Sequence, residues 1–597
     1  MEPLTSSTFA LPETLAAKAD PALIAADEQH FAAIAASLAE SIAELSARLD
    51  AERRAPGGDG QAALDRDLEI HRLTARLRTL RRFGLDLCLG RIVGDDAEPM
   101  YVGRLGLTDS AGRRLLVDWR SPAAEPFFAA THAHPLGLAS RRRYRWTRGR
   151  ITDYWDEVFT PEGLEGHAAL DDQSAFIASL GSTRSPRMRD VLGTIQADQD
   201  AIIRAGSTGA LVVDGGPGTG KTVVALHRTA YLLYADPRVG HDRGGVLFVG
   251  PHEPYLAYVS DVLPSLGEEG VRTATVRDLV PEGAAAGAEP DDEVARLKAT
   301  ARVGEAVEAA VRFYEEPPAR GLTVETPWGD LRLGAEDWAE AFEAPDPGTP
   351  HNEARERVRE ELLAILVDAA EDADVPPDEL REVLAQDRDL RAAFDRAWPL
   401  LEATDVVADL WSVPAYLRRC APWLSPDEVR ALQRTDPAGI VGDRAQARHG
   451  FTESWEERLA RVGVRDVRVA SLTVNYRTPA EVMAEAEPVI RAALPDANVP
   501  TSIRSSGVPV QHGSVAELRS VLDGWLAGHP EGIACVIGEP GFAGTERVRS
   551  LTPVLAKGLE FDLVVLMRPE SFGEGIEGAV DRYVAMTRAT QRLVVLG

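Results

Sequence analysis

Gly215-Gly216-Pro217-Gly218-Thr219-Gly220-Lys221-Thr222 is the stretch that decides the fold of the central part of the chain. It follows a short apolar run at 211–214 and precedes residues 223–233, whose apolar side chains recur at helical spacing. A glycine-rich loop between a strand and a helix lets backbone N–H groups surround phosphates at the helix N-terminus. We therefore predict a nucleotide site in which Lys221 contacts the β- and γ-phosphates of ATP and Thr222 binds Mg²⁺.

Six further segments flank this loop and resemble, in the correct order, the motifs of superfamily 1 helicases: 195–199, 246–251, 440–446, 475–479, 557–562 and 583–589. The resemblance implies that Gln199 contacts adenine. It also implies that Asp443 and Gln446 couple the state of the γ-phosphate to domain movement. Each segment alone is a weak signal, and their common order makes the resemblance specific over about 191–280 and 436–597.

The same resemblance assigns two arginines to the γ-phosphate, Arg477 and Arg588, and adds Glu560 to the nucleotide site. Positive charge around the transferred group is the main source of rate acceleration in phosphoryl transfer. Because Lys221 would lie on one domain and both arginines on a second, nucleotide would close the cleft and hydrolysis would relax it. The expected catalytic set of this motor ATPase is therefore Lys221, Arg477, Arg588 and Gln446.

The composition bounds the remaining possibilities. A chain of 597 residues is too long for one core, and 44% hydrophobic with 27% charged residues is ordinary for a soluble globular protein. No run of about 18 apolar residues and no secretory signal are visible, so we expect a cytoplasmic protein without a membrane span. Cys88, Cys420 and Cys535 lie far apart, which fits a reducing compartment and argues against a zinc site.

The net charge of −29 argues against tight, processive tracking on nucleic acid, which normally requires a basic face. An acidic surface also suits docking into a basic cavity on another macromolecule. Solubility alone explains the charge equally well.

The N-terminal segment predicts an antiparallel helical hairpin. One apolar stripe runs from Ile24 to Leu49 and a second from Leu64 to Leu87, and the Pro/Gly run at 55–60 breaks the helix between them. Two helices of roughly 28 residues would form an arm about 40 Å long. The alternative is a helical pair packed on the body of the protein.

The next segment changes to the period of β-strands. Residues 101–107 and 114–119, separated by Asp109–Gly112, predict a β-hairpin. The stretch 140–150 mixes arginines with two aromatic residues, Tyr144 and Trp146. It is typical either of a strand with a solvated basic face, which we favour, or of a grip on a nucleic-acid backbone.

The fold class predicted from these features is α/β. It comprises two RecA-like P-loop motor domains, an N-terminal antiparallel coiled-coil arm, a small β-rich region and a mostly helical insertion in the first motor domain. We expect the hairpin arm at 1–90 and the β-rich region at 91–190. The first motor domain is expected at 191–280 and 436–470, with the insertion at 281–435 between its two parts. The second motor domain is expected at 471–597.

With its N-terminal arm and its insertion after residue 280, the chain resembles the HelD family of bacterial RNA polymerase recycling ATPases, in particular the actinobacterial form HelR. The resemblance implies that the arm enters the secondary channel of RNA polymerase core and that the insertion enters the primary channel. Nucleic acid would be displaced rather than tightly bound, by a monomer that uses ATP and Mg²⁺. Some actinobacterial relatives are tied to rifamycin tolerance. The carried-over hypothesis puts Asp59, Asp65 and Asp67 nearest the polymerase active centre.

One element expected of superfamily 1 is missing. No apolar strand ending in Asp-Glu, the pair that would hold Mg²⁺ and activate water, lies between Thr273 and Ile440. The nearest imitation, 364–371, lies in a helical stretch about 70 residues before Ile440, and we reject it. We favour the explanation that the sequence omits a stretch near 433–439. A real deletion would instead give a protein that binds ATP without hydrolysing it.

Three functions therefore remain open. The first is an ATP-dependent RNA polymerase recycling factor. The second is a superfamily 1 DNA helicase or translocase. Such a protein would carry an insertion that engages duplex DNA in the second motor domain, and little room for it remains between Arg477 and Lys557. The third is a non-catalytic protein that binds polymerase channels.

Overall fold

The computed structural model of the chain describes residues 7–55, 61–94, 98–160, 192, 195–239, 245–268, 271–280, 283, 289, 291–298, 300–370, 376–432, 459, 466–495 and 497–597. They belong to two compact units. The first comprises Met1–Thr275 with Gln446–Gly597, and the second comprises Val276–Ala445. The range 281–435, in which the sequence predicts an insertion, falls within the second unit.

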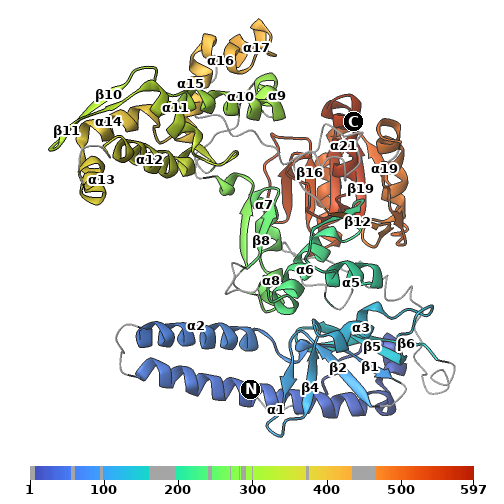
Figure 1. Cartoon of the computed structure of the whole chain (residues 1–597). Helices are drawn as coiled ribbons and strands as arrows, with labels where there is room; N and C mark the ends of the chain where they lie inside the picture. The colour runs from blue at the N-terminus through green and yellow to red at the C-terminus, as the bar shows by residue number, and fades with distance from the viewer. Residues whose placement is uncertain are drawn as a thin grey trace. The chain divides into compact units, whose positions relative to one another are not determined.

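The chain begins with a pair of helices, α1 (Pro21–Arg54) and α2 (Gln61–Arg82), after the short helix η1 (Glu13–Ala19) (Figure 1). Phe31 and Ile34 of α1 are buried in a core shared with the sheet that follows. Leu49, Leu73 and Leu77 form a separate apolar cluster between the two helices. One half of the hairpin thus packs on the body and the other half packs on itself, which combines the two arrangements that the sequence left open.

The two helices are unequal, contrary to expectation, with 34 residues in α1 and 22 in α2. Helix α1 starts early because Asp20 caps it, its carboxylate accepting a hydrogen bond from the Ala22 N–H at 2.9 Å. Of the three aspartates expected at the turn, Asp59 and the side chain of Asp65 lie outside the described residues. Asp67 is exposed at the start of α2.

A six-stranded sheet follows, with the strand order β3-β4-β2-β1-β5-β6. Its strands and the short helices between them are η2 (Leu85–Leu87), β1 (Cys88–Gly94), β2 (Pro99–Gly103), β3 (Leu107–Thr108), β4 (Arg114–Asp118), η3 (Pro122–Ala124), α3 (Glu125–Ala129), β5 (Leu138–Thr147) and β6 (Arg150–Val158). The predicted hairpin is correct only for β3, which pairs antiparallel with β4. Strand β2 pairs with β4 in parallel, because the chain reverses direction between Gly103 and Leu107.

The basic stretch at 140–150 lies on β5 and the turn after it, and its first three arginines are buried. Arg141, Arg142 and Arg143 are 5%, 3% and 5% exposed. Arg142 donates hydrogen bonds to Asp156 at 2.7 and 2.6 Å and to Asp27 of α1 at 2.8 Å. Buried guanidinium groups need such carboxylate partners. Both interpretations of this stretch are therefore wrong for these three residues, which are buried inside the domain. Arg142 joins α1 to the sheet, and Arg141 pairs with Glu157 of the neighbouring strand.

The phosphate loop lies among short strands and helices of the central segment: α5 (Ala197–Arg204), β7 (Ala210–Gly215), α6 (Lys221–Ala235), β8 (Leu247–Gly250), α7 (Glu253–Val259), α8 (Val262–Ser265), β9 (Arg272–Thr275) and β12 (Val467–Leu472). Strand β7 pairs in parallel with β12, and β8 pairs in parallel with β9. The strand, loop and helix predicted around the glycines are thus present.

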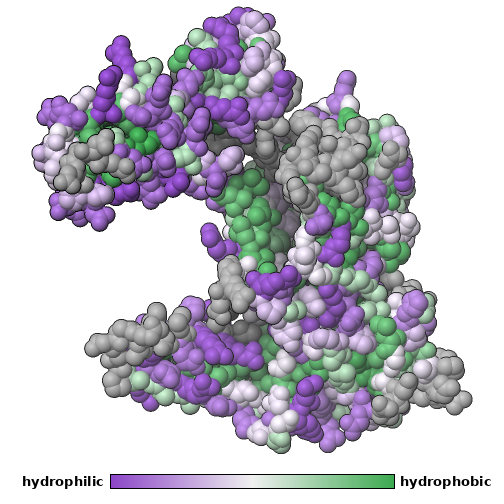
Figure 2. All heavy atoms as spheres, in the orientation of Figure 1, coloured by the Kyte–Doolittle hydropathy of each residue, from purple (hydrophilic) through white to green (hydrophobic). Residues whose placement is uncertain are grey.

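Among the described strands, these two pairs form separate two-stranded sheets. Leu247 and Val249 of β8 are 47% and 43% exposed, and Val469 of β12 is 39% exposed. Figure 2 shows hydrophobic residues gathered at the surface around β8. Apolar side chains on short parallel strands are normally covered on both faces of the sheet. The stretch near 433–439, at which we expect the sequence to lack a strand, lies outside the described residues. Asp368, the carboxylate of the rejected imitation, ends helix α12 (His351–Asp368) rather than a strand.

The C-terminal segment forms a five-stranded parallel sheet with the strand order β15-β19-β18-β16-β17, preceded by a short β13-β14 pair. Its elements are β13 (Val474–Asn475), α19 (Ala480–Ala493), β14 (Thr501–Ser502), β15 (Gln511–Gly513), η13 (Val515–Glu517), α20 (Leu518–Gly528), β16 (Ala534–Ile537), β17 (Val548–Leu551), β18 (Phe561–Met567), η14 (Pro569–Phe572), α21 (Gly575–Met586) and β19 (Ala589–Leu596). Every residue of β18 is buried, which fits a central parallel strand whose sequence, FDLVVLM, is apolar except for Asp562. The chain is therefore a mixed α/β protein.

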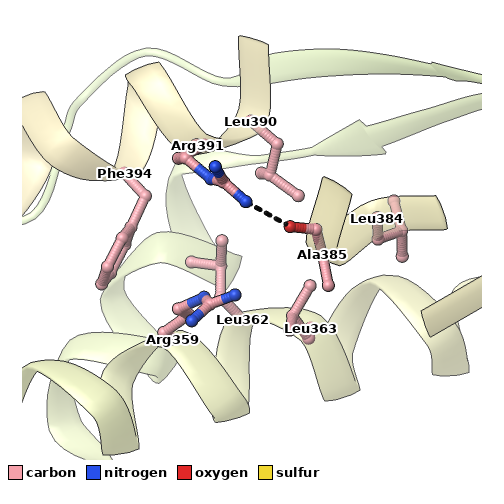
Figure 3. A pocket seen from close by; sticks show the side chains of 8 residues that line it. All are labelled: Arg359, Leu362, Leu363, Leu384, Ala385, Leu390, Arg391 and Phe394. Atoms are coloured by element: carbon pink, nitrogen blue, oxygen red, sulfur yellow. Dashed lines mark hydrogen bonds between the residues drawn. The ribbon is translucent and has the colours of Figure 1, made fainter. Parts of the chain in front are cut away.

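The second unit is mostly helical, with one β-hairpin. Its elements are η7 (Arg277–Leu279), α9 (Asp292–Lys298), α10 (Ala301–Arg312), η9 (Phe313–Glu315), β10 (Leu322–Thr326), β11 (Gly329–Leu333), α11 (Ala335–Glu343), α12, α13 (Pro377–Gln386), α14 (Arg388–Ala397), α15 (Ala403–Ser412), α16 (Pro414–Cys420) and α17 (Pro426–Leu432). A shallow crevice between α12, α13 and α14 is lined by leucines, with Arg359 beside it, and Arg391 there donates a hydrogen bond to the Ala385 carbonyl at 3.1 Å (Figure 3). None of the described helices is both long enough and apolar enough to cross a membrane.

Candidate nucleotide-binding site

The glycine-rich loop connects β7 to α6 in a conformation that requires glycine. Gly218 and Gly220 adopt φ values of 74° and 89°, in the left-handed region that other residues avoid. Thr219 is fully buried, and its hydroxyl donates a hydrogen bond to the Gly216 carbonyl at 2.9 Å, which closes the turn. The 15-residue helix α6 starts at Lys221, directly after the loop. The loop therefore has the backbone shape and the helix N-terminus that bind phosphates.

The loop also has no room for side chains. A Cβ at Gly218 would lie 2.0 Å from the Asn475 Oδ1, and one at Gly216 would lie 2.1 Å from the Pro500 ring. Asn475 is fully buried, and its Oδ1 accepts hydrogen bonds from the backbone N–H groups of Arg477 and Thr478, both at 2.9 Å. The segment around Asn475 thus lies directly on the loop, a contact that sequence reasoning did not predict.

Lys221 lies at the mouth of the loop. Its ammonium donates hydrogen bonds to the carbonyls of Gly215 and Gly216, the latter at 2.8 Å. Burial, together with the charge of Arg588, lowers the pKa of Lys221 from 10.5 to about 8. Lys221 is exposed to solvent, and an ammonium that lies near another cation gains more from a phosphate anion than an isolated ammonium does. Lys221 therefore fits the phosphate-binding role predicted for it.

Gln199 contacts the loop rather than a free surface. It is 6% exposed, its amide NH₂ donates to the Thr219 carbonyl at 2.9 Å, and its Oε1 accepts from the Gln196 N–H at 3.2 Å. A Cβ at Gly220 would lie 2.5 Å from its Nε2. These contacts give Gln199 a supporting position beneath the loop, and its contact with adenine stays a prediction.

The two predicted arginines and Glu560 lie together. The Arg477 guanidinium is 2.5 Å from the Glu560 carboxylate, and both side chains are 13% exposed. Arg588 donates hydrogen bonds to the carbonyls of Val584 at 3.0 Å and Leu559 at 3.3 Å. Burial lowers the pKa of Arg588, and the charge of Glu560 opposes that shift. The positive charge of Arg588 also lowers the pKa of Lys221, which indicates that these two cations influence each other.

Sequence reasoning missed the contribution of α7. The Tyr255 hydroxyl donates a hydrogen bond to the Thr222 Oγ1 at 3.3 Å, and the Tyr255 ring lies against Gly558. His252 and Lys557 are joined by a hydrogen bond between the imidazole Nε2 and the backbone carbonyl at 3.2 Å. The segment 246–251 resembled a motif, but no local pattern indicates where the helix after it lies.

The other predicted residues of the site concern coupling to domain movement and metal binding. Asp443 and Gln446 lie outside the described residues. Within the described ranges, no three His, Cys, Asp or Glu side chains cluster in a way that could hold a metal ion. The role of Thr222 as a ligand of Mg²⁺ stays a prediction, and Pro217 is part of the loop.

Comparison with known proteins relates part of the chain to a family. Residues 24–173 match the family model described as DNA helicase IV HelD, N-terminal domain. Over these residues the chain is similar to that N-terminal domain, which agrees with the resemblance to the HelD family inferred from the sequence. No curated protein sequence matches the chain. Among solved structures, the C-terminal domain of a possible DNA helicase from Lactobacillus plantarum WCFS1 is similar at 16% identity, with a TM-score of 0.16, over 20% of this chain and 86% of that one.

Proposed function

We propose that the protein is an ATP-dependent RNA polymerase recycling factor of the HelD type, in which two RecA-like motor domains close on ATP and Mg²⁺. The observation that carries the proposal is the presence of a HelD-type N-terminal domain and a complete phosphate loop in one chain. A cluster of Lys221, Arg477 and Arg588 supports the nucleotide part, because phosphoryl transfer depends on positive charge around the γ-phosphate.

The proposed mechanism uses the residues described above. The loop 215–220 would bind the phosphates through backbone N–H groups, Lys221 would neutralise them, and Thr222 would hold Mg²⁺, which would supply further charge compensation. Arg477 and Arg588 contact the γ-phosphate from the C-terminal segment, so the two sides approach when ATP is present and separate when the γ-phosphate leaves. Asp443 and Gln446 would report that change to the rest of the chain.

The polymerase part of the proposal rests on the N-terminal hairpin and the helical unit. The hairpin of α1 and α2 would enter the secondary channel, and the unit 276–445 would enter the primary channel, so that the clamp opens and DNA and RNA are released. The net charge of −29 supports docking into cavities that normally hold nucleic acid. We expect a cytoplasmic monomer, with rifamycin tolerance as a consequence of displacing ligands from polymerase.

Two measurements separate this function from its alternatives. Size-exclusion chromatography with bacterial core RNA polymerase should give a stoichiometric complex, and polymerase should stimulate ATP hydrolysis more than bare single-stranded DNA does. The description of the N-terminal family as a DNA helicase favours the second candidate, a DNA translocase, which predicts the opposite order of stimulation. A complex with polymerase but no hydrolysis under any condition would identify a non-catalytic channel-binding protein.

A further inference from the structure

Helix α7 connects Thr222, which follows the phosphate loop, to the segment before β18. Tyr255 is 7% exposed, and its position is fixed on two sides by aromatic neighbours. The Phe248 ring is parallel to its ring at a centroid distance of 6.5 Å, and the His252 ring is perpendicular to it at 6.3 Å. A side chain held in this way presents its hydroxyl at one place.

The Tyr255 hydroxyl lies next to the hydroxyl of Thr222. The Tyr255 O–H donates to the Thr222 Oγ1 at 3.3 Å. A threonine oxygen has two lone pairs, so a hydrogen bond accepted from tyrosine leaves one lone pair for a metal ion. It also makes the threonine proton point elsewhere. The contact therefore selects one orientation of the Thr222 hydroxyl.

The ring of Tyr255 meets the segment at 557–558. Gly558 has a φ of 80°, and a Cβ on it would lie 2.6 Å from the Tyr255 Cδ2 and 2.8 Å from the Cε2. The ring thus lies against the glycine backbone with no room for a side chain between them. His252 strengthens this connection, because its Nδ1 accepts from the Tyr255 N–H at 3.1 Å. Its Nε2 then carries the proton and donates to the Lys557 carbonyl at 3.2 Å.

We infer that Tyr255 is a positioning residue that orients the Thr222 hydroxyl toward the Mg²⁺ of a bound nucleotide and transmits occupancy of that site to residues 557–558. The inference rests on the proposed nucleotide site. Groups that orient a metal ligand from outside the coordination sphere change metal affinity or activity by about 10–100-fold when they are removed. In this inference the hydroxyl of Tyr255 orients Thr222 for the metal ion, and the ring of Tyr255 transmits the change to Gly558.

The hydroxyl is tested by binding of ADP to the full chain, measured by calorimetry in EDTA and at rising MgCl₂ concentrations. Tyr255→Phe should raise the Mg²⁺ concentration for half-maximal gain in ADP affinity about 10-fold. Its ADP affinity in EDTA should stay within about 2-fold of wild type, since no metal is then present. Tyr234→Phe is the matched control, because it removes the same oxygen from a half-exposed tyrosine at the far end of α6 and should change neither value.

Two results would overturn the inference. An unchanged Mg²⁺ midpoint in Tyr255→Phe would show that the hydroxyl does not orient Thr222. An equal loss of affinity with and without Mg²⁺ would show that the residue only supports the fold. A wild-type chain that binds no ADP under either condition would instead contradict the nucleotide site itself, and the inference with it.

The ring is tested by hydrogen exchange of the backbone amides at 557–560, again without polymerase. Addition of Mg²⁺ and ADP should slow this exchange in wild type and in Tyr255→Phe, which keeps the ring. Tyr255→Leu should lose the response while it still binds ADP in EDTA. If the leucine variant responds as wild type does, transmission through the ring is wrong.

Discussion

The guanidinium of Arg477 lies 2.5 Å from the carboxylate of Glu560, although 83 residues separate them in the chain. The two side chains are mostly buried. The negative charge of Glu560 also raises the pKa of Arg588, against the lowering by burial. One carboxylate thus balances two cations next to the phosphate loop. A γ-phosphate would add the negative charge that lets both arginines be neutralised at once.

Arg477→Ala should therefore weaken binding of ATP more than binding of ADP. One lost charge-assisted hydrogen bond corresponds to about 10–100-fold in ATP affinity, whereas ADP has no γ-phosphate to lose. Competition titrations with fluorescent ADP measure both values. Arg491→Ala is the control, because its pair with Glu487 on α19 is 43% exposed on each side. Equal losses for ATP and ADP would place Arg477 away from the γ-phosphate.

Gly218→Ala should abolish detectable nucleotide binding while the fold remains. The new Cβ would lie 2.0 Å from the Asn475 Oδ1, and the φ of 74° adds strain of about 1–2 kcal/mol. Gly112→Ala separates the two effects, because Gly112 has a φ of 81° with no atom within 4 Å. Thermal melting should shift more in Gly218→Ala, which adds the clash to the backbone strain, and only Gly218→Ala should lose ADP. Normal ADP binding by Gly218→Ala would contradict the described loop.

The sequence predicted the loop and the hairpin well because their signals are local. Glycines at fixed spacing after an apolar strand specify one backbone shape, and apolar stripes specify two paired helices. The burial of Arg141–Arg143 was not predictable in the same way, since the carboxylate partners Asp27 and Asp156 lie elsewhere in the sequence. The position of Tyr255 depends likewise on residues 557–558, about 300 positions away.

Asp27 illustrates how long-range ion pairs stabilise the N-terminal domain. It is fully buried and accepts hydrogen bonds from the Tyr101 hydroxyl at 2.7 Å and from Arg142 at 2.8 Å. Asp27→Ala leaves a buried guanidinium with one partner fewer and should cost about 3–5 kcal/mol of stability. Urea denaturation followed by circular dichroism measures the loss. Arg54→Ala, which removes an exposed pair with Asp50, should leave the urea midpoint unchanged.

Asp200 should make the stability of the fold depend on pH in an unusual direction. Burial raises the pKa of its carboxyl from 3.8 to about 6, although Arg204 acts against that shift. Because the folded-state pKa is above the unfolded value, the ionised carboxylate lowers stability above pH 6, and this cost disappears as the pH falls below about 3.8.

Asp200→Asn removes that cost. It should be more stable than wild type at pH 7.5 by up to about 3 kcal/mol, and the difference should shrink toward pH 4. Urea midpoints from pH 4 to 8 for wild type, Asp200→Asn and the exposed control Asp50→Asn measure the effect. A variant that is less stable than wild type at pH 7.5 would show that the pair with Arg204 outweighs burial.

The central claim is that nucleotide-dependent movement of this protein acts on RNA polymerase. The most direct measurement is release of a fluorescent DNA–RNA scaffold from preformed core RNA polymerase complexes, followed on native gels with and without ATP, for wild type and Lys221→Ala. We predict that wild type binds the complex and releases the scaffold, and that Lys221→Ala fails to recycle for further rounds. A scaffold that stays bound, together with unwinding of bare duplex DNA by the same preparation, would contradict the account.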